Sequence, residues 1–139
     1  MPSIDLQSCE PKLREAFLRG KREAESALPG LTLRVTCTHR SAQEQFTLWQ
    51  MGRAYQSGQW VVVDPAKIVT QVDGAKAVSN HNHFPSRAID FCVTWGGKVS
   101  WAEADYNVVG PYFEKEGLVW GGSWATFKDR CHVEVPHDP

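Results

Sequence analysis

The side chains best suited to chemistry in this sequence are histidines and aspartates. His81, His83 and Asp90 lie within ten residues of one another, and His132 follows near the C-terminus. Neutral imidazole and carboxylate groups suit Zn²⁺, and three protein ligands leave a fourth position for water. We therefore predict a catalytic zinc site built from two histidines and Asp90, with His132 as one of the histidines.

Asp129 and Arg40 are the residues expected to act on a substrate beside such a metal ion. Zinc acidifies its bound water toward neutral pH, and a carboxylate outside the ligand set must then take the proton and pass it to the leaving amine. Asp129 precedes His132 by three residues, within reach for this task. Arg40 could hold a substrate carboxylate or a developing oxyanion. Simpler interpretations are that Asp129 caps a turn and that Arg40 pairs with Glu44.

Hydrophobic spacing predicts the elements of the first half of the chain. Apolar residues at helical spacing predict a helix over about residues 11–28. Ser41 and Glu44 form a capping box, which predicts a second helix that ends near Met51. Residues 31–37 alternate between apolar and polar side chains, which predicts a strand with the apolar positions Leu31, Leu33, Val35 and Cys37.

The second half contains the strands expected to carry the metal ligands. Residues 88–94 predict a strand on which Asp90 faces away from the apolar side chains Ile89, Phe91 and Val93. A capping box at residues 100–103 predicts a helical region to about residue 116, which Gly110-Pro111 should kink or restart. Short strands are expected over residues 118–120 and 131–135, and a strand or buried loop over residues 60–63.

These elements predict an α+β fold with a mainly antiparallel sheet and flanking helices, because no βαβ rhythm is present. If the strands that carry Asp90 and His132 pair, and their apolar residues pack on the helices, Asp90 and His132 share the open face of the sheet. No repeat, low-complexity segment or long linker divides the chain. We therefore expect residues 1–139 to form a single catalytic domain.

Composition and charge exclude several classes of protein. The 139 residues are 42% hydrophobic and 22% charged, and no apolar run approaches the ~20 residues of a membrane helix. The net charge of −1 argues against nucleic acid as a partner. We expect that the protein does not insert stably into a membrane and that it is a monomer. The four widely separated cysteines are expected to be mostly buried thiols.

The order of motifs resembles the zinc D,D-/L,D-peptidases that degrade bacterial cell walls, including phage L-alanyl-D-glutamate endopeptidases. The matching motifs are His39-Arg40-Ser41, Ser79-x-His81 with Ala88-x-Asp90, Trp120-Gly121-Gly122, and Asp129-x-x-His132. The resemblance spans roughly residue 12 to the C-terminus. It implies a small antiparallel sheet with flanking helices, shared with hedgehog signalling domains, and peptidoglycan stem peptides as the substrate.

The resemblance also implies a role for each matching residue. It assigns zinc ligation to His81, Asp90 and His132, and the general base to Asp129. It assigns a substrate or oxyanion contact to Arg40, and it places Ser79 in the lining of the substrate pocket.

The sequence departs from the family pattern at two points. The residue before Arg40 is His39, where tyrosine is usual, and the interval from His81 to Asp90 is longer than the usual interval between the histidine and the aspartate. Counting back from Asp90 favours His83, whereas the Ser-x-His signature favours His81. We prefer His81, because Pro85 stiffens the backbone and Phe84-Pro85-Ser86 can form a small excursion that lengthens the interval.

The residues and the resemblance leave several functions open. The expected activity is hydrolysis of the L-Ala–D-Glu bond, with D-Ala–D-Ala carboxypeptidase or dipeptidase as alternatives. Residues 1–5 lack the basic and apolar regions of a signal peptide, so we expect synthesis in the host cytoplasm and action on the cell wall after release, as in a phage endolysin. A nuclease, suggested by the string His-Asn-His, and a non-catalytic zinc-stabilised binding module are two further hypotheses.

Overall fold

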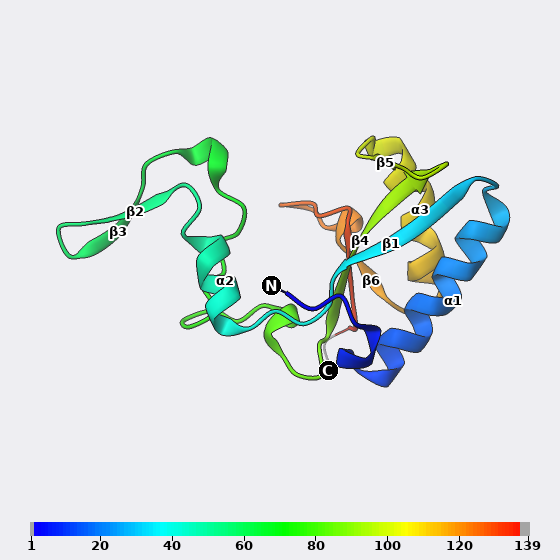
Figure 1. Ribbon diagram of the computed structural model, residues 1–139, viewed down its shortest axis with the longest axis horizontal. Coiled ribbons are helices and arrows are strands. Elements are labelled where there is room, and N and C mark those ends of the chain that lie inside the picture. The colour runs from blue at the N-terminus through cyan, green and yellow to red at the C-terminus, as the bar shows by residue number, and fades with distance from the viewer. Residues whose placement is uncertain (1, 137–139) are drawn as a thin grey trace.

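The computed structural model of the chain describes residues 2–136 (Figure 1). The predicted domain of residues 1–139 therefore includes Met1 and residues 137–139, which lie outside the described residues. No helix within residues 2–136 is long and apolar enough to cross a membrane.

An antiparallel sheet forms the centre of the molecule, which confirms the predicted α+β class. Its strands run in the order β1-β4-β7-β6, and a further strand, β5, also pairs with β4. The strands are β1 (Leu31–Cys37), β4 (Ala88–Trp95), β5 (Lys98–Ser100), β6 (Val119–Trp120) and β7 (His132–Glu134).

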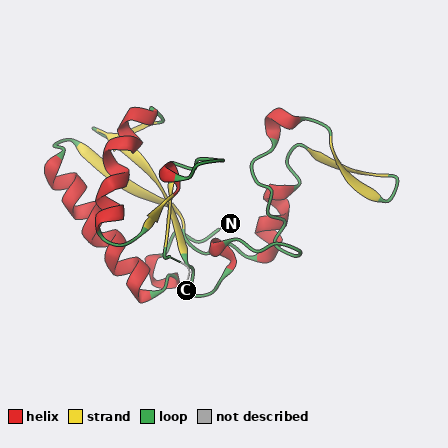
Figure 2. Cartoon of the chain, turned by 180° about the vertical axis from the view of Figure 1, so that it is seen from behind, coloured by secondary structure: helices red, strands yellow, loops and turns green. Residues whose placement is uncertain are grey.

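Two helices, α1 (Pro11–Ala27) and α3 (Glu103–Lys115), cover one side of this sheet (Figures 1 and 2). Phe17 of α1 stacks on Phe113 of α3 with ring centroids 5.1 Å apart, and both rings contact Phe91 of β4. All three rings are fully buried. The core therefore lies between the helices and the sheet, and the opposite face of the sheet is free to carry a site.

A segment that we call the arm, residues 42–78, projects from the sheet on the side away from α1 and α3 (Figure 1). It contains α2 (Ala42–Trp49) and a hairpin of β2 (Arg53–Gln56) and β3 (Gln59–Val62). Rings of Phe46, Trp49 and Trp60 contact one another with centroids 5.3–5.7 Å apart, which holds the hairpin against α2. The predicted capping box at Ser41 is confirmed, but α2 ends two residues before Met51.

Four short 3₁₀ turns complete the described elements: η1 (Leu6–Ser8), η2 (Pro65–Lys67), η3 (Asn80–Asn82) and η4 (Gly121–Ser123).

The cysteines are free thiols, as predicted; Cys9, Cys37 and Cys92 are buried and Cys131 is half-buried.

The start of α3 differs from the prediction. Ser100 ends β5 instead of capping the helix, and its hydroxyl donates to the carboxylate of Asp105. Ala102 is the N-cap residue and makes no side-chain hydrogen bond there. The capping box at residues 100–103 is therefore wrong, because sheet pairing with β4 holds Ser100 in an extended strand.

The predicted interruption of α3 at Gly110-Pro111 is also wrong in part, because the helix does not restart there but runs through Pro111 to Lys115. Gly110 lies against the ring of Trp120, where an added Cβ atom would come within 2.2 Å of the indole. Packing of α3 on β6 thus favours an unbroken helix. Gly117, with φ +89°, follows the C-cap residue Glu116 in the left-handed conformation with which many helices end.

Candidate metal centre

Sheet register brings three chemically active side chains into one row. Asp90 on β4 pairs directly with His132 on β7, and on its other side with Cys37 at the end of β1. Residues directly opposite each other in a sheet point to the same face. The row therefore lies on the face that α1 and α3 leave free, as the sequence predicted for Asp90 and His132.

Cys37 reaches this face through an irregularity in β1. Val35 pairs with Phe91, yet Cys37 pairs with Asp90, so the register shifts between Val35 and Cys37. A bulge of this kind adds one residue to a strand and turns the following side chain to the other face. Cys37 therefore leaves the apolar face that the simple alternation of residues 31–37 gave it.

The turn η3 carries His81 to the same place. Ser79 caps this turn: its hydroxyl accepts from the His81 backbone N–H at 3.2 Å, and its own N–H donates to the Asn82 side chain at 2.9 Å. The Arg40 N–H donates to the His81 carbonyl at 2.8 Å, which ties the turn to the end of β1. Although His81 lies in a turn, its side chain is only 3% exposed, so it is buried as deeply as a core residue.

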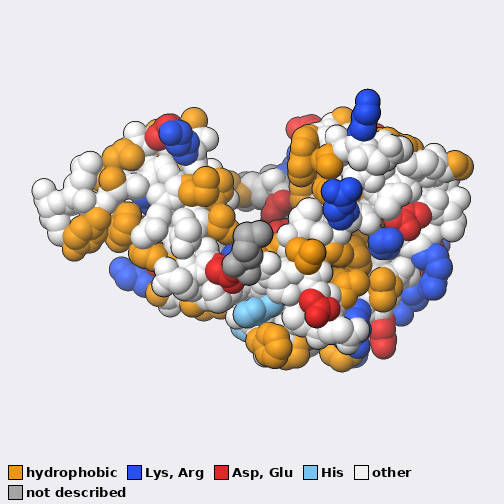
Figure 3. Space-filling view, viewed as in Figure 1, with side chains coloured by type: hydrophobic (Ala, Val, Ile, Leu, Met, Phe, Trp, Pro, Cys, Tyr) orange, Lys and Arg blue, Asp and Glu red, His pale blue; other side chains and the backbone are white. Residues whose placement is uncertain are grey.

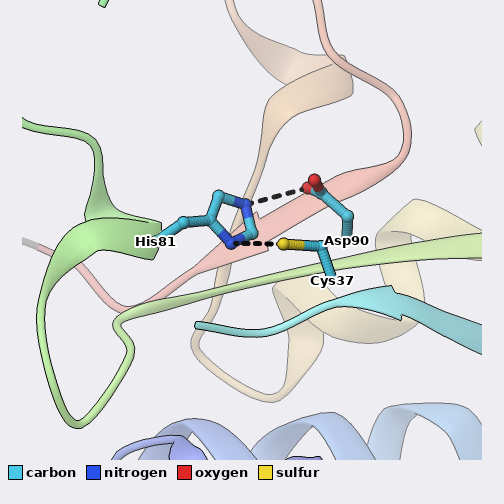
Figure 4. Close-up of side chains that lie close together, drawn as sticks. All are labelled: Cys37, His81 and Asp90. Carbon is cyan, nitrogen blue, oxygen red and sulfur yellow. Dashed lines mark hydrogen bonds and ion pairs between the residues drawn. The ribbon is translucent and has the colours of Figure 1, made fainter. Parts of the chain in front are cut away.

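The imidazoles of His81 and His132 approach the same carboxylate oxygen. His81 Nε2 lies 3.1 Å and His132 Nδ1 lies 3.0 Å from Asp90 Oδ1. Figure 4 shows the His81 ring between Asp90 and Cys37, with its two nitrogens directed to opposite sides. His81 Nε2 is buried and has no hydrogen-bond partner of acceptable geometry.

Backbone and side-chain acceptors fix which nitrogen of each ring carries a proton. His81 Nδ1 lies 2.7 Å from the Thr38 carbonyl, which can only accept, so Nδ1 donates and Nε2 is the nitrogen available to a metal. His132 Nε2 lies 2.6 Å from Glu134 Oε1, which leaves Nδ1 directed at Asp90. Each ring therefore presents one nitrogen to the space beside Asp90.

Electrostatics at this position favour positive charge. Burial lowers the pKa of His81, but the neighbouring Asp90 carboxylate and Cys37 outweigh burial and raise the pKa to about 10. For His132, burial is outweighed by hydrogen bonds to Asp90 and Glu134, which raise the pKa to about 9. Burial favours the neutral form of Asp90, yet the hydrogen bond from His132 and the adjacent His81 imidazole hold the pKa of this carboxyl well below its usual range.

The donor set fits a divalent transition metal such as zinc. Asp90 belongs to two groups of potential ligand atoms that lie within 4.8 Å of one another: one adds Cys37 and His81, and the other adds Asp129 and His132. Imidazole nitrogen and carboxylate oxygen are common zinc ligands, and a buried Nε2 without a hydrogen-bond partner is the arrangement a metal would complete. Neither group contains both His81 and His132, and these two imidazoles meet only through their common neighbour Asp90 Oδ1. His81, Asp90 and His132 therefore stay the predicted ligand set.

Asp129 lies at the edge of this cluster. Its Oδ2 is 4.0 Å from His132 Nδ1, and its side chain is 51% exposed. Burial of the carboxyl and the neighbouring negative charge of Asp90 raise the pKa of Asp129. Asp129 is therefore more basic than an ordinary aspartate and accessible to a substrate, as a general base requires.

The other predicted site residues occupy less direct positions. Arg40 lies beside Asp90, with Nη2 3.6 Å from Asp90 Oδ2 and Nη1 donating to Gln45 at 2.8 Å. Ser79 acts as the cap of η3 and is half-buried. His83 is exposed. The zinc-ligand, base and substrate roles of all these residues stay predictions.

Sequence reasoning missed several residues that surround the cluster: Cys37, Thr38, Asn80 and Glu134. The signal for Glu134 was present, because it lies two residues after His132 and so faces the same way on β7. Cys37 and Thr38 carried no such signal, because a bulge and a backbone carbonyl decide their contacts.

Comparison with known proteins confirms the family resemblance. Residues 73–135, which contain both histidines and both aspartates of the cluster, match the family described as D-alanyl-D-alanine carboxypeptidase. The chain is 28% identical over 123 residues to peptidoglycan L-alanyl-D-glutamate endopeptidase CwlK of Bacillus subtilis strain 168, an alignment that covers 81% of this chain. The chain spans 66% of the length of that relative.

The fold also matches a solved structure. The crystal structure of the L-Ala D-Glu endopeptidase ChiX of Serratia marcescens superposes with a TM-score of 0.65 and 19% sequence identity, and the match covers 94% of this chain and 83% of that one. This likeness confirms the predicted α+β fold, with its antiparallel sheet and flanking helices.

Proposed function

We propose that the chain is a zinc metallopeptidase that hydrolyses the stem peptides of peptidoglycan, with the L-Ala–D-Glu bond as its target. The observation that carries this proposal is the convergence of His81 Nε2 and His132 Nδ1 on Asp90 Oδ1, with the basic carboxylate of Asp129 beside them. The names of both matched endopeptidases support the choice of bond.

A cleft beside the metal centre could hold the peptide. It has a volume of about 910 Å³ and is lined by arm residues on one side and the loop before β7 on the other. Figure 3 shows the molecule hollowed between the arm and the sheet. Asp129 lines this cleft together with Val62, Val69, Trp124 and Phe127. A substrate in the cleft would therefore meet the proposed base directly.

When bound by His81, Asp90 and His132, zinc would supply Lewis acidity and lower the pKa of bound water. The side chains of this protein would do the rest. Asp129 would accept a proton from the attacking water and pass it to the leaving amine nitrogen. Arg40, held next to Asp90, would bind a carboxylate or carbonyl oxygen of the substrate.

The test is digestion of purified peptidoglycan with and without a strong chelator, followed by mass spectrometry. We expect chelator-sensitive release of fragments with a new N-terminal D-Glu. Release of free D-Ala instead would support D,D-carboxypeptidase activity, the alternative favoured by the description of the matching family. Binding to peptidoglycan without hydrolysis would support the zinc-stabilised binding module, and full activity in a metal-free sample would exclude the zinc mechanism.

The bacteriolytic role of a phage endolysin belongs to the same proposal, and it is supported by the substrate class that the relatives' names give. Purified protein added to bacteria with a permeabilised outer layer should lower their turbidity. Expression inside cells should cause lysis only when a membrane-pore protein is expressed with it. Lysis without such a pore would contradict the proposed route to the cell wall.

A further inference from the structure

Glu134 is a buried carboxylate that the proposed mechanism does not use. It is 9% exposed and lies on β7, where its backbone pairs with Ala88 on one side and Val119 on the other. A carboxylate this deep in a sheet is costly to bury unless hydrogen-bond donors surround it. The identity of its donors therefore indicates its role.

The two oxygens of Glu134 accept hydrogen bonds from two different parts of the site. Oε1 accepts from His132 Nε2 at 2.6 Å, and Oε2 accepts from the Asn80 side-chain amide at 2.8 Å. Asn80 belongs to η3, directly before His81 in the sequence. One carboxylate thus connects the strand that carries one histidine with the turn that carries the other.

We propose that Glu134 is a positioning residue that links the two predicted histidine ligands, a role that rests on the proposed zinc site. Through His132 it fixes the ring so that Nδ1 faces the metal position. Through Asn80 it holds η3, and with it His81, at a set distance from β7. Carboxylates that accept from a ligating histidine typically change metal affinity 10- to 100-fold when removed.

In this link Asn80 donates a hydrogen bond and Glu134 accepts it. The link can therefore be tested by exchanging the amide and the carboxylate between the two positions. Glu134→Gln leaves one oxygen for two donors, so an N–H must face either His132 or Asn80. Asn80→Asp places two carboxylates against each other. In the double variant, the amide introduced at position 134 can donate to the carboxylate introduced at position 80, while the amide oxygen still accepts from His132. The link is then restored with reversed polarity.

Zinc affinity of the full chain, measured by competition with a chromophoric chelator, reports the effect. We expect each single variant to bind zinc at least about tenfold more weakly than the unmodified chain, on the scale known for such partners. The double variant should bind more tightly than either single variant. Unchanged affinity in Glu134→Gln, or losses that simply add in the double variant, would overturn the proposal.

Glu25→Gln is a matched control, because Glu25 also accepts from two donors, the Leu33 N–H and Lys21, but lies outside the metal centre. It should lower the melting temperature of the zinc-free chain and leave zinc affinity unchanged. A purely structural role for Glu134 would give the same result as this control.

Nitrogen-15 NMR of the unmodified zinc-loaded chain provides a second test that does not depend on variants folding. His132 should carry a slowly exchanging proton on Nε2, and His81 should carry its proton on Nδ1. A His132 ring that is unprotonated at Nε2 would overturn the proposal. Zinc binding with the expected variant effects but no hydrolysis would refute only the proposed function.

Discussion

At the scale of single residues, the neighbouring aspartates Asp90 and Asp129 differ in their surroundings. The two neighbouring imidazoles of His132 and His81 hold the pKa of Asp90 well below its usual range, despite burial. Burial and the charge of Asp90 raise the pKa of Asp129. When their environments move the pKa values of two carboxyl groups apart, the two groups can take different roles. Asp90 is then suited to bind a metal as a permanent anion, and Asp129 is suited to accept a proton.

Asp129→Asn should therefore remove turnover without removing metal. The amide keeps the shape of the side chain but cannot accept the proton, so we expect a rate loss of at least about 10²-fold, the usual scale for general acid–base help. Zinc content, measured by atomic absorption, should stay near one ion per chain. Loss of zinc in proportion to activity would make Asp129 a ligand or a structural residue.

Arg40→Lys should lower kcat/KM while zinc content and folding are retained. Lysine lacks the planar fork that lets Arg40 contact Gln45 and approach Asp90 at the same time. Arg34→Lys changes an exposed arginine on β1, the strand before Arg40; it is the control and should behave as the unmodified chain. Ordinary kinetics in Arg40→Lys would show that the guanidinium has no role in catalysis.

His81 and His83 provide a direct comparison of buried and exposed imidazoles in one loop. His81→Ala should lose stoichiometric zinc, because its Nε2 is the nitrogen directed at Asp90. His83→Ala should keep most of the zinc and lose less activity, since His83 is exposed. The reverse pattern would show that the interval to Asp90 was the better guide to the ligand.

At the scale of elements, the Trp120-Gly121-Gly122 motif connects α3 with the loop that carries Asp129. Cβ atoms added at Gly110 and Gly122 would lie 2.2 and 2.1 Å from the Trp120 indole, so both glycines are in contact with this ring. Trp120 Nε1 donates to the Arg130 carbonyl at 2.9 Å, and the Gly121 carbonyl accepts from the Asp129 N–H at 3.0 Å. The motif therefore sets the position of the predicted base.

Gly110→Ala should destabilise the protein by about 1–3 kcal/mol, because overpacking forces Trp120 away from α3. Denaturant unfolding gives the free energy, and activity should fall in folded protein as the Asp129 loop shifts. Val108→Ala, on the exposed side of the same helix, should change the free energy of unfolding by less than about 0.5 kcal/mol. Equal stability of the two variants would contradict the close contact at Gly110.

At the scale of the whole molecule, the proposed ligands come from β4, β7 and a turn just before β4, so a bound ion would join distant parts of the chain. Anything that binds only the folded state stabilises it, by about 2.7 kcal/mol when its concentration is 100 times Kd. Zinc should therefore raise the melting temperature of chelator-treated protein, and the gain should be absent in His132→Ala. A zinc-independent melting temperature would contradict a site made by folding.

The sequence by itself determined most of the local structure. Amphipathic spacing located α1 to within one residue of its end, and alternation located β1 and β4, because these patterns follow from which face each element buries. The hairpin of the arm was only half predicted, since residues 53–56 are not buried and form a strand by pairing with β3. The second capping box failed because pairing with β4 outweighed the local signal at Ser100.

The tertiary structure alone decided the environment of the metal centre. Alternation could place Asp90 and His132 on a common face, but the bulge that turns Cys37 toward His81 depends on pairing between β1 and β4. The Thr38 carbonyl orients the His81 imidazole through a contact between residues 43 positions apart in the chain, whereas Glu134 lies only two positions from His132 on β7. The orientation of His81 therefore arises from the packing of separate segments, and no local sequence pattern encodes it.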